Sequence, residues 1–397
     1  MVGIDCSGER LFAHALRAPR TWRIDVHWLS ERFEFKRGNA SNIGSMEGLR
    51  GFAVLLVFLV HYESLLKPWI ANDAPLLAFA GSLHIVGNVG VDLFFLLSGY
   101  LIYGTLISRQ QSFLPFFARR LQRIYPAFTV VFVVYVALSL LMPSESKIPK
   151  DNAALYLLAN YLLLPGLFPI QAMITVAWSL SYEMFCYLLL PVMVTFLKLR
   201  DRTVGWRVTL FLSIAVAFSV YTALNGGPVR LIMFISGIVL YEAITKSELR
   251  AHPAAGAIAL ITGLAFMLWP LAGPAGETLK LVVLFVTFFV FGLACFRTPQ
   301  AWLPAAFSRT PLRWLGNMSY SYYLVHGLTL KAGFLVLSWI LPPTGGESVL
   351  HWLLLLPMFG LTLIPSAMLF LLIERPFSLE PRASHSVKRI SQVASAD

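Results

Sequence analysis

The chain has 397 residues, of which 57% are hydrophobic and only 13% are charged, and its formal net charge is +11. A mean hydropathy of +0.71 excludes an ordinary soluble domain, because a soluble surface needs many more charged side chains. The basic residues lie in short loops without the interleaved aromatics or motif of a nucleic-acid-binding module, so we expect no nucleic-acid partner. Recurring apolar runs of about 20 residues instead predict an all-α polytopic membrane protein.

Residues 1–45 form a polar segment of mixed charge that precedes the first apolar run. No hydrophobic stretch follows its basic residues, so it is not predicted to be a signal peptide. We expect a cytoplasmic N-terminal extension. The alternative is that Met46 is the true start of the protein.

Eleven apolar runs follow, near residues 47–66, 86–108, 124–142, 153–168, 177–197, 206–225, 229–245, 254–272, 278–296, 314–340 and 350–373. The run at 153–168 is short and is interrupted by Asn160, Pro165 and Gly166. We therefore expect it to be interfacial or re-entrant rather than to cross the membrane. The other runs predict a bundle of about ten transmembrane helices.

The distribution of Lys and Arg predicts the orientation of these helices. If the N-terminus is cytoplasmic, the basic residues gather in loops on the cytoplasmic side and in the C-terminal tail: 109–123, 198–207, 246–253, 297–313 and 378–397. The opposite loops carry few basic residues, which are Lys67, Lys147, Lys150, Arg230 and Lys280. This asymmetry predicts that both termini lie in the cytoplasm. We therefore predict a membrane domain at 46–377 between the cytoplasmic extension (1–45) and a cytoplasmic tail (378–397).

Four of the predicted helices each bring one titratable residue to a common depth: His61, Asp92, Glu183 and His326. An ionisable side chain in a bilayer is costly and usually faces the interior of the bundle. Counting from the predicted helix ends places all four about 8–12 Å below the external face. They predict an acid–base cluster. The alternative for each is a structural role, as a hydrogen-bonded packing residue or, for Asp92, as a helix cap.

A second polar group is predicted at the cytoplasmic side. Arg50 opens the first long helix, and three arginines precede the helix at 124–142: Arg119, Arg120 and Arg123. Guanidinium groups pair bidentately with phosphate oxygens, so this cluster suits a phosphate-containing ligand. The alternative is that these arginines only orient the helices and contact lipid headgroups.

Arg50 and His61 lie eleven residues apart on one predicted helix. That is about three turns, or about 16 Å, so both project from nearly the same face. His61 is the predicted general base, which takes a proton from an acceptor hydroxyl. Glu183 or Asp92 is expected to orient the imidazole or relay the proton. The arginine cluster lies at the cytoplasmic side and the acid–base cluster lies near the external face. This arrangement fits a donor that enters from the cytoplasm and an acceptor on the other side.

The same stretch of chain carries a series of short motifs: Gly48-Leu-Arg50 with ten residues before His61, residues 90–102, 119–126, 178–183 (Trp-Ser-Leu-Ser-Tyr-Glu), 315–326 and 373–376 (Ile-Glu-Arg-Pro). Together and in this order they resemble the acyltransferase type 3 family of integral-membrane O-acyltransferases, over residues 45–377. One departure is Glu47, where the family more often has Asp, which preserves the charge.

The resemblance implies a ten-helix domain that takes an acyl group, usually acetyl, from cytoplasmic acyl-CoA. The group passes to a hydroxyl of an extracytoplasmic or membrane-proximal acceptor, commonly a glycan. By the same resemblance, His61 matches the catalytic histidine and Arg50 its paired arginine. Glu183 matches the motif glutamate, and Arg119, Arg120 and Arg123 fall on the basic segment associated with the CoA phosphates.

The predicted site therefore has three parts. His61, Glu183 and Asp92 are the catalytic candidates, Arg50 and the three arginines bind the donor, and three further residues contact substrate: His326, Trp178 and Tyr182. Acetyl-CoA is expected as co-substrate, with no permanently bound cofactor and no metal, because no ligand set has metal-site spacing. We expect a cell inner membrane location, and other membrane proteins of glycan biosynthesis remain candidate partners.

Two other functions stay open at this point. A proton-coupled transporter or flippase also uses intramembrane Asp, Glu and His, although no inverted repeats are visible. A scaffold of a glycan-export system with degenerate chemistry is the other. The sequence leaves the acceptor and the acyl chain length undetermined.

Overall fold

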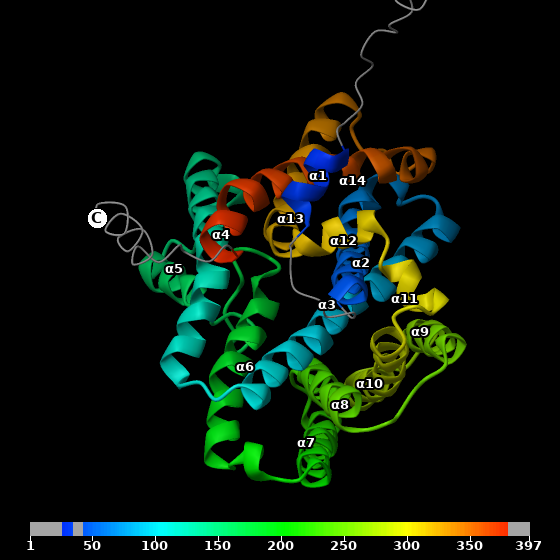
Figure 1. Ribbon diagram of the computed structural model, residues 1–397. Coiled ribbons are helices and arrows are strands. Elements are labelled where there is room, and N and C mark those ends of the chain that lie inside the picture. The colour runs from blue at the N-terminus through cyan, green and yellow to red at the C-terminus, as the bar shows by residue number, and fades with distance from the viewer. Residues whose placement is uncertain (1–25, 35–42, 380–397) are drawn as a thin grey trace, which may run out of the picture. The chain divides into compact units, whose positions relative to one another are not determined.

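A computed structural model describes residues 26–34 and 43–379 of the chain (Figure 1). Residues 1–37 and 38–397 form two separate units, and α1 (Val26–Phe33) is the helix described in the first. The described residues are helical apart from their loops and one isolated β-bridge, between Pro165 and Phe168. The predicted all-α class is confirmed.

The second unit consists of helices joined by short loops. Its α-helices are α2 (Ile43–Ile70), α3 (Ala74–Ser108), α4 (Phe113–Leu141), α5 (Ala153–Tyr161), α6 (Ala177–Phe196), α7 (Val204–Asn225), α8 (Ile232–Lys246), α9 (Pro253–Met267), α10 (Gly273–Arg297), α11 (Trp302–Phe307), α12 (Thr310–Asn317), α13 (Ser319–Ile340) and α14 (Val349–Leu369). Short 3₁₀ turns are η1 (Pro143–Glu145), η2 (Leu199–Asp201) and η3 (Val229–Leu231), and the π-helical segment η4 (Phe370–Leu379) continues α14.

Eight helices among the described residues are long and apolar enough to cross a bilayer: α2, α3, α4, α6, α7, α10, α13 and the continuous segment of α14 with η4. The chain is a multi-pass membrane protein. Nine of the ten apolar runs predicted to span each form one helix, and the run at 314–340 is divided between the end of α12 and α13. Helices α8 and α9 have only 15 residues each. Such a helix is about 22 Å long, which is less than the hydrocarbon core of about 30 Å.

The two short helices have local causes. Val229–Leu231 forms the 3₁₀ turn η3 instead of the first turn of α8, after Gly226 and Gly227 with φ values of 74° and 129°. Helix α9 ends at Met267, three residues before Pro270. Proline cannot donate a backbone hydrogen bond and disfavours helix in the residue before it, so the predicted run to residue 272 is too long.

Helices α3 and α4 begin well before the apolar runs indicate. Helix α3 begins at Ala74, where the Asp73 side chain accepts a hydrogen bond from the Leu76 N–H at 2.9 Å. Asp92 therefore lies in the middle of α3, and the alternative that it caps a helix is wrong. Helix α4 begins at Phe113, so the three arginines predicted to precede a helix, Arg119, Arg120 and Arg123, belong to its first turns instead.

The run at 153–168 forms no span in the structure. Helix α5 has nine residues, so it is about 13 Å long, and a folded loop follows it. The Asn160 side chain holds this loop, because its Oδ1 accepts from the Met173 N–H at 2.8 Å and its Nδ2 donates to the Gln171 carbonyl at 3.3 Å. Gly166, with φ of 93°, lies within that loop.

Helix α2 packs against α11 and α12 at backbone contact distance (Figure 1). A Cβ atom on Gly48 would lie 1.4 Å from the Phe307 carbonyl oxygen, and one on Gly51 would lie 2.0 Å from that of Leu312. From the other side, a Cβ on Gly316 would lie 1.7 Å from the Glu47 carbonyl oxygen. Small residues at a helix crossing allow this approach, so the Gly48-Leu-Arg50 motif fixes the start of α2.

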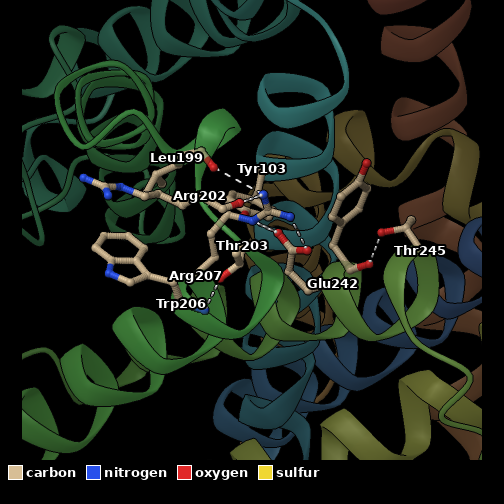
Figure 2. A network of polar contacts seen from close by, with 9 residues as sticks. Tyr103, Leu199, Arg202, Thr203, Trp206, Arg207, Glu242 and Thr245 are labelled. Atoms are coloured by element: carbon tan, nitrogen blue, oxygen red, sulfur yellow. Dashed lines mark hydrogen bonds and ion pairs between the residues drawn. The ribbon is translucent and has the colours of Figure 1, made fainter.

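A buried polar network joins α3, α7 and α8 (Figure 2). The Arg207 guanidinium donates to both carboxylate oxygens of Glu242, at 2.6 and 2.8 Å, and Tyr103 donates its hydroxyl proton to the same carboxylate. Arg207 Nη1 also donates to the carbonyls of Leu199 and Arg202, at 3.2 and 2.9 Å. The buried charges are thereby paired and hydrogen-bonded, as burial requires.

Candidate active site

The imidazoles of His61 on α2 and His326 on α13 are adjacent. Their ring centroids lie 4.9 Å apart at an interplanar angle of 68°. His61 is half-buried, whereas His326 is fully buried. The structure thus brings together two of the four titratable residues that the sequence predicted to converge.

The protonation of His326 follows from its hydrogen bond. Its Nδ1 lies 2.9 Å from the Tyr322 carbonyl oxygen, which can only accept, so Nδ1 carries the proton. The other ring nitrogen, Nε2, is therefore unprotonated in the neutral ring. It is buried and has no hydrogen-bond partner among the described residues.

A third imidazole, on His84 of α3, lies close enough to His61 to interact with it electrostatically. Its Nδ1 is 3.2 Å from the Val60 carbonyl oxygen and 3.1 Å from Ser64 Oγ. Sequence reasoning missed His84 because the predicted apolar run, 86–108, begins two residues after it. The Asp73 cap and the apolar residues after it are the signal that extends the helix to include it.

Glu183 on α6 has partners on its own helix and on α3. Its Oε1 accepts hydrogen bonds from the Tyr187 hydroxyl and, at 3.3 Å, from Ser98 Oγ. The Arg120 guanidinium lies over the Tyr187 ring, 5.3 Å from its centroid. Glu183 is thereby linked to a predicted phosphate-binding arginine, and none of the hydrogen bonds or ring contacts of the described residues joins it to His61.

Glu374 in η4 belongs to the same arginine cluster. It is fully buried, and its Oε2 accepts from the N–H and the hydroxyl of Ser321, at 3.0 and 2.6 Å. Arg123 and Arg50 both interact electrostatically with this carboxylate. The sequence assigned no role to Glu374, although the Ile-Glu-Arg-Pro motif contains it. Arg119, at the edge of the cluster, donates to the Gln111 side chain.

Asp92 is fully buried on α3 and forms an ion pair with Arg230 of η3. Arg230 Nη1 lies 2.6 Å from the carboxylate and also donates to the Asn88 carbonyl at 3.2 Å. Sequence reasoning counted Arg230 as a loop charge, and no local pattern indicates its partner 138 residues away. The described contacts of Asp92 include none with His61.

Trp178 and Tyr182 lie at the start of α6 in an aromatic cluster with Phe95 of α3. The ring centroids are 5.6 Å apart for Trp178 and Tyr182, and 6.3 and 5.9 Å from these rings to Phe95. Their helix is joined to the histidine pair through Tyr323, whose hydroxyl is 2.7 Å from Ser179 Oγ and whose ring is 6.0 Å from that of His326.

A buried acid–imidazole pair, Glu63 with His351, lies apart from the His61–His326 pair. His351 Nε2 of α14 is 3.0 Å from Glu63 Oε1, and the Tyr62 hydroxyl donates to the His351 carbonyl at 2.7 Å. The rings of Phe79 and Trp352 contact His351 and line a pocket of about 370 Å³, at the starts of α3 and α14. This pocket contains none of the predicted site residues.

A family model described as an acyltransferase domain, acyltransferase type 3, matches residues 43–371. Among curated proteins, the chain is similar to O-acetyltransferase OatA of Staphylococcus aureus strains NCTC 8325 / PS 47, COL and MRSA252, with 26% identity over 317 residues. The aligned part is 71% of this chain and 49% of OatA, so the chain spans about half the length of these relatives. No solved structure matches the chain.

Proposed function

Because the chain belongs to the acyltransferase type 3 family, we propose that it moves an acyl group from cytoplasmic acyl-CoA to a hydroxyl of an extracytoplasmic or membrane-proximal acceptor. The similarity to OatA, an O-acetyltransferase, favours acetyl-CoA as the donor. A glycan is the proposed acceptor. Acyl-CoA acts as a co-substrate in this proposal, and no permanently bound cofactor is required.

The observation that supports this proposal is that α2 carries both a candidate donor-binding arginine, Arg50, and a candidate general base, His61. Arg50 interacts with the arginine–carboxylate cluster at one end, and His61 stands in the imidazole pair about 16 Å further along the helix. Arginines suit the phosphates of CoA. An imidazole that is only half-buried suits proton transfer at a hydroxyl.

The proposed chemistry is a direct transfer. His61 takes the proton of the acceptor hydroxyl as its oxygen attacks the thioester carbonyl carbon. The new C–O bond forms, the C–S bond breaks, and the CoA sulfur leaves with the proton returned by His61. Arg50, Arg119, Arg120 and Arg123 hold the donor, which converts the reaction into one between positioned groups.

The remaining predicted residues take roles that fit their surroundings. Glu183, linked through Tyr187 to Arg120, is proposed to act at the donor end of the site. Asp92 is proposed to hold Arg230 close to Tyr323 and Tyr182. Trp178 and Tyr182 present aromatic surfaces that are proposed to contact the acceptor.

The proposed topology has ten membrane-embedded helices and both termini in the cytoplasm, in a bacterial inner membrane. The positions of the basic loops support it, and so does the bacterial origin of the relatives. The domain at 46–377 is proposed to carry the activity. The proposed cytoplasmic segments, 1–45 and 378–397, lie largely outside the described residues.

The test is transfer of label from [¹⁴C]acetyl-CoA to material in membrane vesicles that contain the protein. We expect transfer with the wild-type protein and a loss of at least about 100-fold in His61→Ala, the scale of a missing general base. Mass spectrometry of surface glycans from cells with and without the gene identifies the acceptor by an acetyl-sized difference.

Two results would contradict the proposal. Unchanged transfer by a folded His61→Ala variant would remove His61 from the mechanism. Vesicles that accumulate a glycan intermediate without any acyl-CoA, and show no label transfer, would favour the transporter or flippase function instead.

A further inference from the structure

We propose that His326 is a positioning residue that fixes the tautomer and the orientation of His61. The base would then be oriented by a second, neutral imidazole in place of the carboxylate that the sequence predicted. This inference rests on the proposed function, in which His61 is the general base. The sequence suggested that His326 contacts substrate, but its complete burial favours action through His61.

His326 has a ring nitrogen that accepts a hydrogen bond but has no donor. Its Nδ1 proton is committed to the Tyr322 carbonyl, so Nε2 offers a lone pair. That atom is buried, and no described residue donates to it. A buried acceptor without a donor costs free energy. We therefore expect a donor to bond to His326 Nε2 when substrate occupies the site.

The hydroxyl groups of the tyrosines that contact His326 already have other hydrogen-bond partners. The Thr362 hydroxyl donates to the Phe359 carbonyl at 2.6 Å, so the Tyr322 hydroxyl, 2.9 Å from Thr362, donates to it. The Tyr323 hydroxyl is engaged with Ser179 and with the Val176 carbonyl, at 2.7 and 3.1 Å.

With those hydroxyls committed, the ring that contacts His326 and still has an N–H to give is His61, at 4.9 Å between centroids. Hydrogen bonds at catalytic bases are often long in the unliganded enzyme and tighten when substrate binds.

The nearby carboxylates are paired with residues other than His61. Glu183 bonds to Tyr187 and Ser98, Asp92 pairs with Arg230, and Glu63 pairs with His351. None of these described contacts reaches His61. A nucleophile or base is normally oriented by a third group, and among the described contacts His326 is the candidate that touches the imidazole.

The consequence for His61 is a defined tautomer. If its N–H on the inner side donates to His326 Nε2, its other nitrogen is unprotonated and available to the acceptor hydroxyl. When His61 takes the proton, the resulting imidazolium keeps the same hydrogen bond to a neutral partner.

His84 differs from His326 in a way that supplies a control. It interacts with His61 from α3, but it is only half-buried, and its Nδ1 already contacts Val60 and Ser64. Water can reach a half-buried side chain, so His84 does not depend on His61 for a partner. We expect His84→Gln to keep transfer within about threefold of wild type.

The experiment compares His326→Phe with His326→Gln in the [¹⁴C]acetyl-CoA assay on membrane vesicles. Phenylalanine keeps a ring without an acceptor, and the glutamine amide oxygen can take the place of Nε2. We expect His326→Phe to lower kcat about 100-fold with an unchanged KM for acetyl-CoA. His326→Gln should recover at least about tenfold of that loss, and thermal unfolding of both variants in detergent should match the wild type.

A double variant tests whether His326 acts through His61. His61→Ala combined with His326→Phe should be no slower than His61→Ala alone, because residues that act as a unit are not additive. An active wild type with a normal His326→Phe would overturn the inference and leave the proposed function standing. So would an equal loss in His326→Gln or in His84→Gln, or a loss that follows reduced thermal stability. An inactive wild type would overturn the proposed function itself, and this inference with it.

Discussion

The arginines predicted to bind the donor already have neighbours that hold them in place. Arg120 lies over the rings of Phe116 and Tyr187, and Arg123 interacts with the buried Glu374 carboxylate. A ligand with phosphate groups must therefore share these guanidinium groups with the carboxylates. Guanidinium groups present several N–H donors in a fixed plane, which makes such sharing possible.

Arg123→Gln should weaken the use of acetyl-CoA but not that of acetylpantetheine, which lacks the nucleotide phosphates. A charge-assisted hydrogen bond to phosphate contributes about 1.5–3 kcal/mol, so kcat/KM for acetyl-CoA should fall about 10- to 100-fold. Arg123→Lys should recover part of it, since lysine keeps the charge without the bidentate geometry. Steady-state kinetics with the two donors measures the difference.

The matched control for this prediction is Arg250→Gln. The Arg250 side chain is 74% exposed and lies 3.7 Å from Glu248, outside the cluster. It should leave both donors unaffected. An equal loss for acetyl-CoA and acetylpantetheine in Arg123→Gln would show that Arg123 does not bind the nucleotide phosphates.

At the scale of elements, buried ion pairs decide how α3, α7 and α8 are held together. Arg207 and Glu242 have side chains that are 6% and 1% exposed. Removing one partner of such a pair leaves an uncompensated charge, whereas removing both can be nearly neutral. The two outcomes separate the cost of a lone buried charge from the contribution of the pair.

Glu242→Ala should destabilise the protein by about 3–5 kcal/mol, because Arg207 would remain buried without its carboxylate. The double variant Arg207→Met with Glu242→Leu should recover most of that loss. Thermal or denaturant unfolding in detergent measures both. Glu248→Ala serves as the control, since this exposed partner of Arg297 and Arg250 should change stability by no more than about 1 kcal/mol. A Glu242→Ala protein as stable as the control would contradict this account.

At the scale of the whole molecule, hydrophobic runs were enough to predict the class and the order of the helices. They could not place helix ends, because caps and prolines rather than hydropathy set them, as Asp73 and Pro270 illustrate. Within the site, counting along the helices placed His61 and His326 at one depth, but it did not predict that their rings are in contact. The partners of Asp92 and Glu242 were not predicted either, because their arginines lie 138 and 35 residues away and were read as loop charges.

The proposed topology predicts opposite accessibility for the two ends of the α7–α8 hairpin. In a variant with Cys6 replaced by serine, Asn225→Cys should react with a membrane-impermeant maleimide on spheroplasts, and Glu248→Cys should not. Inverted vesicles should reverse the pattern. The remaining native cysteines, Cys186 and Cys295, are buried and give a low background. The opposite pattern in both preparations would place the termini outside the cytoplasm.

The contact between α2 and α12 bears on how the protein can move while it works. Gly48 places the backbone of α2 against the Phe307 carbonyl at the end of α11, Gly51 places it against the Leu312 carbonyl of α12, and Gly316 closes the contact from α12. There is no room for α2 to slide or rotate there without breaking its crossing with α12. Alternating access by rocking of helix bundles would need such a displacement of the helix that carries His61. A catalyst whose reactants travel to a stationary helix needs no displacement of that helix.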